Sequence, residues 1–300
     1  MQIVHAQDVP LRDRANADGG RAGTFKIRRM LKGDPDSPGN FSLVIYYQDG
    51  SFYSPRHRHS FDQFRYQIEG EADFARNGKM RPGVLGYFPE GAYYGPTSGP
   101  AHIVAVLQFG GPSGCGYLAE GGGAAEELRK LGVFEKGIFR RSPGVPGKKN
   151  QDAYEAIWEH TRGRKLIYPK PQYQAPVMID SNQFPWSPVA DVTGVEEKLL
   201  GVFTNCRIRG ARYKLAPGAR FRAEGRGIYL VLSGEGAVEG APWREHTVVY
   251  LDDGEHARFA AQSLTEIVLM GMTSVAQMAK TPDCEDALQL VDMATCRNTR

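Results

Sequence analysis

SPRHRHSFDQFRYQIEGEADFARNGKMRPGVLGYFPEGAYYGP, residues 54–96, is the stretch on which the predicted fold and site depend. It places His57 and His59 one residue apart. Side chains two residues apart on a β-strand point to the same face. Both imidazoles can therefore reach one point, as the first two ligands of a divalent metal ion must. The alternative is a pair of exposed histidines in a basic loop, because Arg56 and Arg58 flank them.

The spacing around the histidine pair resembles the first motif of the cupin family. That motif runs glycine, five residues, His-x-His, three or four residues, Glu, six residues, Gly. His57, His59 and Gly70 match it, and Gln63 stands where the family has Glu.

The second cupin motif follows in the same stretch. It runs Gly, five residues, Pro-x-Gly, two residues, His. Gly83, Pro89 and Gly91 match it, and Tyr94 stands where the family has its third histidine. The resemblance covers roughly residues 40–110 and implies a jelly-roll β-barrel with a metal site, and the departures at Gln63 and Tyr94 both fall on metal ligands.

Short β-rich segments with glycine turns flank this stretch and return after residue 177, which is typical of all-β barrels. The strand end at Gly234 parallels the one at Gly70. Counting back from Gly234 by the same intervals reaches Phe221 and Ala223 in place of the histidines. We therefore expect a mostly β bicupin, with two tandem cupin barrels of which only the first carries a histidine pair.

The residues between the two β-rich halves differ in composition. They predict helices over 124–131 and 152–162, the second with Asp152 as N-cap and Glu155 completing a capping box. The basic segment 136–150 reads as a loop. The expected division is an N-terminal cupin at 1–112, a helical insert and linker at 113–176, and a degenerate cupin at 177–300 that ends in a helix over 281–296.

The candidate metal ligands are His57, His59, Gln63 and a further residue, His102 or Tyr94. The amide oxygen of Gln63 is neutral, so it would bind a metal ion more weakly than a carboxylate. Gln63 could equally support the histidines or the substrate by hydrogen bonding. A phenol is an uncommon ligand because it must first lose a proton with a reference pKa of about 10.

Further side chains are candidates for binding or transforming a substrate. Arg65 could hold an anionic substrate through paired hydrogen bonds. Tyr66 and Tyr93 are expected to line an aromatic pocket. Gln63 and Tyr94 are the candidate catalytic residues. The alternative for each charged or aromatic residue is a place on the solvated or packed outer face.

The resemblance implies a metal-dependent enzyme that acts on a small organic molecule, with a dioxygenase-type oxidoreductase as the leading hypothesis. Fe(II) is the favoured cofactor, and Ni, Zn or Mn are possible. One alternative is a non-catalytic bicupin that binds a small molecule. Another is a metal-free isomerase or epimerase in which His59 and Tyr94 exchange protons.

The bulk composition excludes several classes of protein. The formal net charge of +3 is far from that of a nucleic-acid-binding domain, and no apolar run is long enough to cross a membrane. The N-terminus lacks the apolar segment of a secretory signal, and the four cysteines have no paired spacing. We therefore expect a cytoplasmic protein, a homodimer by default, whose partner is a small molecule.

Overall fold

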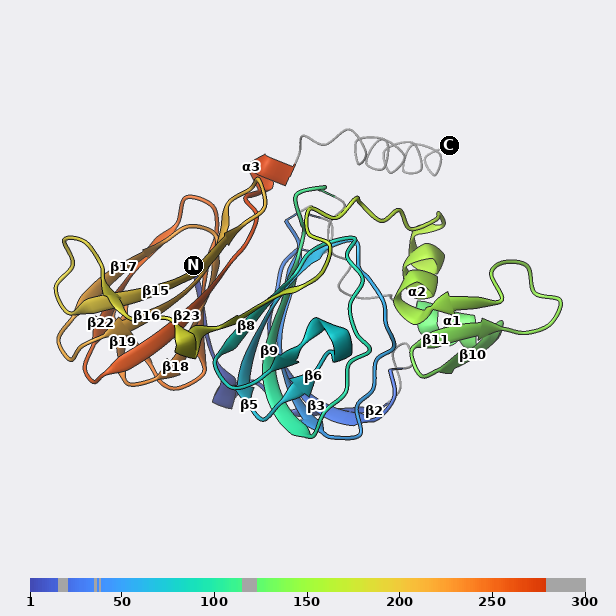
Figure 1. Ribbon diagram of the computed structural model, residues 1–300, viewed down its shortest axis with the longest axis horizontal. Coiled ribbons are helices and arrows are strands. Elements are labelled where there is room, and N and C mark those ends of the chain that lie inside the picture. The colour runs from blue at the N-terminus through green and yellow to red at the C-terminus, as the bar shows by residue number, and fades with distance from the viewer. Residues whose placement is uncertain (16–20, 35–36, 38, 115–122, 279–300) are drawn as a thin grey trace.

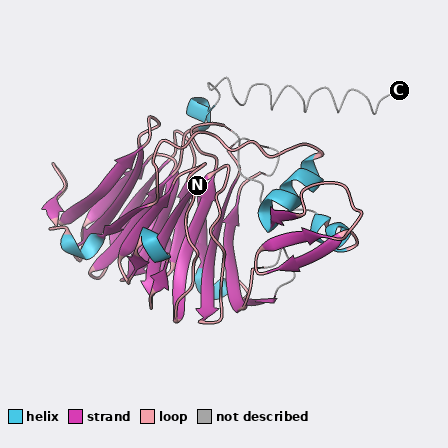
Figure 2. Cartoon of the chain, turned by 45° about the vertical axis from the view of Figure 1, so that its right-hand side comes forward, coloured by secondary structure: helices cyan, strands magenta, loops and turns pink. Residues whose placement is uncertain are grey.

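The two halves of the chain form two β-barrels that lie side by side, and a smaller insert packs on the far side of the first barrel (Figure 1). The computed structural model describes residues 1–15, 21–34, 37, 39–114 and 123–278. Strands dominate both barrels, whereas the longer helices lie in the insert (Figure 2). The mostly β, two-barrel prediction is confirmed.

An antiparallel seven-stranded sheet forms the main wall of the N-terminal barrel. Across the sheet, the strands are β13 (Val177–Asp180), β8 (Val84–Phe88), β5 (Asp62–Glu69), β9 (Ala101–Phe109), β4 (Phe41–Asp49), β3 (Thr24–Lys32) and β2 (Arg12–Ala15). A hairpin of β6 (Ala72–Asp73), η2 (Ala75–Asn77) and β7 (Lys79–Met80) lies beside it. Gly70 follows β5 with φ +67°, and a Cβ there would lie 2.4 Å from the Ala101 carbonyl oxygen. The motif glycine is therefore required by the backbone.

The C-terminal barrel repeats this architecture. Its larger sheet contains β1 (Gln2–His5), β21 (Thr247–Leu251), β18 (Gly227–Ser233), β23 (Thr265–Gly271), β16 (Ile208–Leu215), β15 (Val195–Phe203) and β14 (Ser187–Pro188). The smaller sheet contains β17 (Arg220–Glu224), β22 (His256–Ala261), β19 (Gly236–Val238) and β20 (Ala241–Trp243). Short helical turns are η1 (Ala6–Asp8), η3 (Ser181–Gln183) and α3 (Val275–Met278).

Each barrel contributes one strand to the other. β1, at the N-terminus, pairs with β21 of the C-terminal barrel. β13, which follows the insert, pairs with β8 of the N-terminal barrel. The predicted domain boundaries at residues 112 and 176 remain a prediction. Each main sheet contains one strand from beyond the boundary of its own barrel.

The largest apolar core joins the outer faces of the two barrels. Phe203 of β15 stacks on Tyr87 of β8 with ring centroids 4.6 Å apart and meets Phe64 of β5 edge-on at 5.6 Å. These three side chains are fully or almost fully buried. Because each aromatic side chain buries a large apolar area, this contact couples the two barrels.

The insert is a small α/β unit: α1 (Ala124–Arg129), β10 (Gly132–Glu135), β11 (Ile138–Arg141), β12 (Asn150–Asp152) and α2 (Ala153–Arg162). Both predicted helices are present, and Asp152 caps α2 as expected. The prediction of a simple loop over 136–150 was wrong near both ends, where strands β11 and β12 lie. Segments 132–135 and 138–141 pair as a hairpin around Phe139, which packs with Leu128 and Ala156.

The predicted C-terminal helix over 281–296 lies outside the described residues. Within the part of the chain that the structure covers, no helix has the length and apolarity needed to span a membrane.

Candidate functional site in the N-terminal barrel

His57 and His59 lie together inside the N-terminal barrel. Their side chains belong to residues only 6% and 7% exposed, and their ring centroids are 4.8 Å apart. His57 forms a β-bridge with Tyr94, in which each backbone N–H donates to the other residue's carbonyl oxygen at 3.0 and 2.9 Å. This burial rules out two exposed loop histidines and brings the two cupin-like motifs side by side.

The hydrogen bonds of His57 determine which of its ring nitrogens is free. Its Nδ1 lies 2.7 Å from the Pro55 carbonyl oxygen, which can only accept, so Nδ1 carries the hydrogen. Burial, helped by the positive charge of Arg21, holds the pKa of both His57 and His59 well below the ordinary histidine value. Both imidazoles are therefore neutral near pH 7. His57 Nε2 keeps a lone pair available for a metal ion or a proton.

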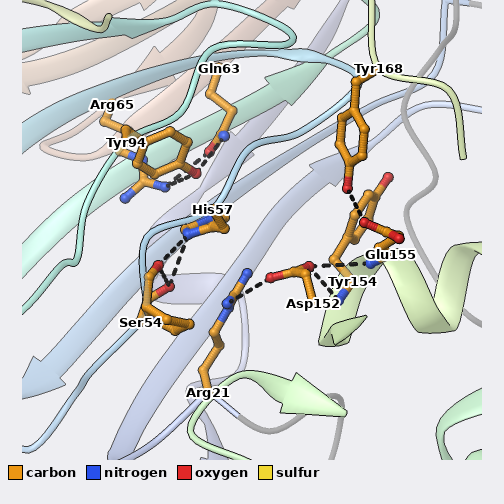
Figure 3. A network of polar contacts seen from close by, with 11 residues as sticks. Arg21, Ser54, His57, Gln63, Arg65, Tyr94, Asp152, Tyr154, Glu155 and Tyr168 are labelled. Atoms are coloured by element: carbon orange, nitrogen blue, oxygen red, sulfur yellow. Dashed lines mark hydrogen bonds and ion pairs between the residues drawn. The ribbon is translucent and has the colours of Figure 1, made fainter. Parts of the chain in front are cut away.

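Gln63, Arg65 and Tyr94 form a closed triangle of hydrogen bonds beside the histidines (Figure 3). Arg65 donates to the Gln63 amide oxygen at 3.1 Å and to the Tyr94 hydroxyl at 3.0 Å. Since arginine can only donate, the amide of Gln63 is oriented with Nε2 toward Tyr94, to which it donates at 2.9 Å. The Tyr94 oxygen thus accepts two hydrogen bonds, which leaves its own hydrogen for a third partner.

Arg65 is a half-buried cation whose hydrogen-bond partners, Gln63 and Tyr94, are neutral. Its guanidinium lies over the rings of Phe88, Phe74 and Tyr94 at 4.6, 5.2 and 5.3 Å from their centroids. In the described part of the chain it makes no ion pair with a carboxylate, and its Nε is buried without a hydrogen-bond partner. Such a cation provides an attractive position for an anionic ligand.

The structure places three other predicted site residues away from this group. His102 is buried, and its Nδ1 donates to the Pro100 carbonyl oxygen at 2.8 Å. Its Cβ lies 2.8 Å from the position of a Cβ on Gly70, at the opposite end of β5 from the histidine pair. No three His, Cys, Asp or Glu side chains of the described residues form a group able to hold a metal ion. The expectation of His102 as a ligand beside His57 and His59 is therefore corrected.

Tyr66 and Tyr93 also differ from their predicted places in the pocket. Tyr66 belongs to the core between the barrels, on the face of β5 opposite Arg65, because neighbouring strand residues point to opposite sides. It is not part of the pocket. Tyr93 is 42% exposed, with the guanidinium groups of Arg56 and Arg58 at 4.6 and 4.8 Å from its ring. It contributes to the outer surface.

Residues far away in the sequence complete the surroundings of the histidines. Arg21 lies on the segment before β3. Its positive charge lowers the pKa of both imidazoles. Tyr154, in the first turn of α2, meets the His59 ring edge-on with centroids 5.1 Å apart. Figure 3 shows Arg21 and Tyr154 on one side of His57, and Arg65 and Tyr94 on the other. No local sequence pattern indicated either contact.

A buried pair of carboxyl groups lies on the other face of β5. Asp62 accepts hydrogen bonds from the Tyr87 hydroxyl and the Glu90 backbone N–H, each at 2.8 Å. Glu90 accepts from the backbone N–H and the hydroxyl of Ser113 at 2.8 and 2.6 Å. Burial raises the pKa of Asp62 to about 7 and that of Glu90 to about 8. This pair can hold a proton near neutral pH.

His57 and His59 are suited to fill two coordination positions of one divalent metal ion. Neutral, buried histidines are suitable ligands, and the hydrogen bond from His57 Nδ1 to a carbonyl oxygen is the kind that orients a metal-binding imidazole. The oxygens of Gln63 and Tyr94 already accept hydrogen bonds from Arg65. An ion held here would therefore have two protein nitrogens, and its other positions would be filled by substrate or water.

The C-terminal barrel lacks this chemistry. At the positions equivalent to the histidines, Phe221 and Ala223 are buried, and Phe221 packs on Tyr213 at 4.4 Å. A hollow of about 510 Å³ is lined in part by Tyr213 and Phe221. Charged groups in its lining are largely paired with one another, as in the Arg209–Glu197 and Arg222–Glu224 ion pairs. We therefore assign the candidate site to the first barrel.

Comparisons with known proteins identify the fold. No protein-family model and no curated sequence matches the chain. The structure is similar to that of a candidate dioxygenase from Nostoc punctiforme, with TM-score 0.59 and 12% identity over 90% of this chain and 81% of the other. It is also similar to a protein from Geobacillus kaustophilus, with TM-score 0.51 and 11% identity over 91% and 95%.

A third similar structure is the oxalate decarboxylase of Bacillus subtilis, a protein with Mn(II) centres. The TM-score is 0.51 and the identity 14%, over 91% of this chain and 78% of the other. At such identities the likeness concerns the fold and leaves the chemistry open. Together with the two barrels described above, it identifies the chain as a protein with the bicupin fold.

Proposed function

We propose that the N-terminal barrel is a metal-dependent enzyme site for a small organic anion, most simply an oxidoreductase of the dioxygenase type. The observation that carries the proposal is the juxtaposition of two buried neutral histidines with an arginine that has no carboxylate partner among the described residues. The similar structures of a candidate dioxygenase and a manganese-containing decarboxylase support a metal-dependent reaction.

His57 and His59 would hold the ion, with Fe(II) favoured over Mn, Ni or Zn. When bound, a divalent ion supplies Lewis acidity, and iron adds redox reactivity toward dioxygen. Arg65 would bind a carboxylate of the substrate, because its guanidinium is held beside the histidines by Gln63 and Tyr94. Tyr94 would present its remaining hydrogen to a substrate oxygen, while the rings of Phe74 and Phe88 exclude water.

The first test is elemental analysis of the purified protein without a histidine tag. We expect about one divalent ion per chain, and its loss in the His57→Ala/His59→Ala variant. Dioxygen uptake with a panel of small carboxylates would follow. Protein that contains no metal and cannot be reconstituted with Fe(II), Mn(II), Ni(II) or Zn(II) would exclude this function.

A metal-free acid–base reaction is the second candidate. The Tyr94 ring lies 4.4 Å from the His57 ring and 5.9 Å from the His59 ring, and its hydroxyl accepts a hydrogen bond from the Arg65 guanidinium at 3.0 Å. A proton could then pass between the substrate and His59 or Tyr94, as in an isomerase or epimerase. Activity that survives a chelator and disappears in Tyr94→Phe would favour this candidate. A bicupin that only binds its ligand would show neither activity.

We further propose a homodimer acting in the cytoplasm on a small molecule. Light scattering of the full chain would test the assembly, and fractionation of cells that express it would test the location.

A further inference from the structure

The insert contacts the histidine site directly through an aromatic corner. Tyr154 of α2 meets His59 at 86° and Phe61 at 75°, with centroid separations of 5.1 and 5.5 Å. His59 in turn stacks on Phe61 at 4.5 Å. The ring of His59 is thus contacted by a residue of the insert, a separate unit of the fold.

One carboxylate both starts the helix and anchors it to the barrel. Oδ1 of Asp152 accepts from the backbone N–H groups of Tyr154 and Glu155 at 2.9 and 3.2 Å, which caps α2. Oδ2 of the same side chain pairs with Arg21 at 3.5 Å. Figure 3 shows this ion pair between the helix start and His57. The orientation of Tyr154 is therefore fixed by a contact to a barrel residue that lies near both histidines.

The turn between β10 and β11 adds a second anchor. Gly137 has φ +82°, and a Cβ there would lie 2.7 Å from both Arg21 Nη1 and Pro55 Cδ. Its carbonyl oxygen accepts from the Ala153 backbone N–H at 2.9 Å. Pro55 supplies the carbonyl that holds His57. The insert thus packs against the segment that orients the first histidine.

We propose that the insert is the outer wall of the histidine site, that Tyr154 is a specificity-determining residue in it, and that the Asp152–Arg21 ion pair holds this wall in place. The ligand part rests on the proposed function. With Arg65 binding a carboxylate on one side and the rings of Phe61 and Tyr154 on the other, the pocket suits a carboxylate attached to a flat unsaturated or aromatic body. A short aliphatic acid would leave the aromatic corner unfilled.

The first experiment measures the wall without any ligand. Diethyl pyrocarbonate modifies neutral imidazoles, and peptide mass spectrometry follows its rate at His59. We expect Tyr154→Ala to raise this rate about tenfold by uncovering the ring, and Tyr154→Phe to keep it within about twofold. Ile157→Ala is the matched control, since it loosens the same helix on the side that packs within the insert. An unchanged rate in folded Tyr154→Ala, or an equal rise in the control, would overturn the wall.

Asp152→Asn isolates the ion pair and serves if Tyr154→Ala does not fold. Asparagine still caps a helix, so α2 should persist, while the attraction to Arg21 is lost. We expect the His59 rate to rise about threefold. A His59 modification rate equal to that of the native protein would show that Asp152 does not anchor the insert.

The second experiment measures the ligand class by calorimetry with benzoate and acetate. We expect the native protein to prefer benzoate, and Tyr154→Ala to reduce that preference about fivefold while the acetate affinity stays constant. Equal losses for both acids would indicate a merely structural role. If the native protein binds neither acid while Tyr154→Ala still exposes His59, the proposed anion site fails and the wall stands. If both acids bind and neither readout changes, the wall fails and the anion site stands.

Discussion

Arg65 donates a hydrogen bond over 3.0 Å to the hydroxyl of Tyr94, the residue that stands where the cupin motif has its third histidine. The tyrosine that stands in place of the motif histidine is thus hydrogen-bonded to arginine, a side chain that keeps its positive charge. A guanidinium at this position repels a second cation and attracts an anion. Metal affinity and anion affinity are therefore expected to respond in opposite directions when Arg65 is changed.

Arg65→Gln should weaken acetate binding and strengthen Mn(II) binding. Glutamine can still donate a hydrogen bond to Tyr94 but carries no charge. Loss of a charged hydrogen bond costs about 1.5–3 kcal/mol, or roughly 10- to 100-fold in affinity. Calorimetry with each ion checks both signs. The exposed Arg76→Gln is the control for net charge. Acetate affinity that stays constant in Arg65→Gln would contradict the anion role.

Tyr94→His should place a third imidazole beside His57 and His59, at the proposed metal position. The β-bridge between His57 and residue 94 fixes the backbone at this point, so the new side chain starts from the right place. A further imidazole ligand is expected to tighten Mn(II) binding about 10- to 100-fold, measured in competition with a chelator. Tyr94→Phe, which removes only the hydroxyl, should leave Mn(II) affinity within about threefold. Equal affinities for all three proteins would place the metal elsewhere.

The elements that depend on local sequence were predicted well. The turn glycines and the Asp152 cap each act over a few residues, so the sequence pattern contains their physical cause. The two histidines lie together as expected, but the strand predicted for them is reduced to an isolated bridge between His57 and Tyr94. Tyr66 shows where the prediction failed although a signal existed. Neighbouring residues of a strand face opposite sides, so Arg65 and Tyr66 cannot both line one pocket.

The contacts of Arg21 and Tyr154 show where no local signal exists. Tyr154 is brought to His59 by the packing of the insert, across more than 90 residues of sequence, and Arg21 reaches the histidines from the segment before β3 of the barrel. His102 lies on β9, and its distance from the histidine pair is set by how the strands are staggered. Neither packing nor stagger can be read from spacing alone.

Phe203→Ala should destabilise both barrels together. Phe203 packs between Tyr87 and Phe64 of the N-terminal barrel, and removing such a buried ring costs about 3–5 kcal/mol. We expect urea unfolding to remain a single transition that moves to lower urea. The exposed neighbour Val202→Ala should change little. Two separate transitions, with only one displaced, would show that the barrels unfold independently.

Glu90→Gln should change how stability depends on pH. Burial raises the pKa of Glu90 to about 8, far above that of an exposed glutamate. Between about pH 4.5 and 8 the folded state therefore binds more protons than the unfolded state, so the free energy of unfolding falls as pH rises. The stability that comes from the protonated Glu90 is fully present below the pKa of the unfolded state. It is lost as the pH rises through the pKa of the folded state. For one proton the slope reaches about 1.4 kcal/mol per pH unit.

Urea unfolding at pH 5 and pH 9 measures this contribution. A glutamine at position 90 can accept from the Ser113 backbone N–H and donate to its hydroxyl, so both contacts of Glu90 have a replacement. We expect the variant to resemble the native protein at pH 5 and to be more stable by about 1–3 kcal/mol at pH 9, because no buried charge then forms beside Asp62. Glu69→Gln, at the exposed end of β5, controls for the loss of one acidic group. If the native and Glu90→Gln proteins lose the same stability between the two pH values, the carboxyl pair does not retain its proton on folding.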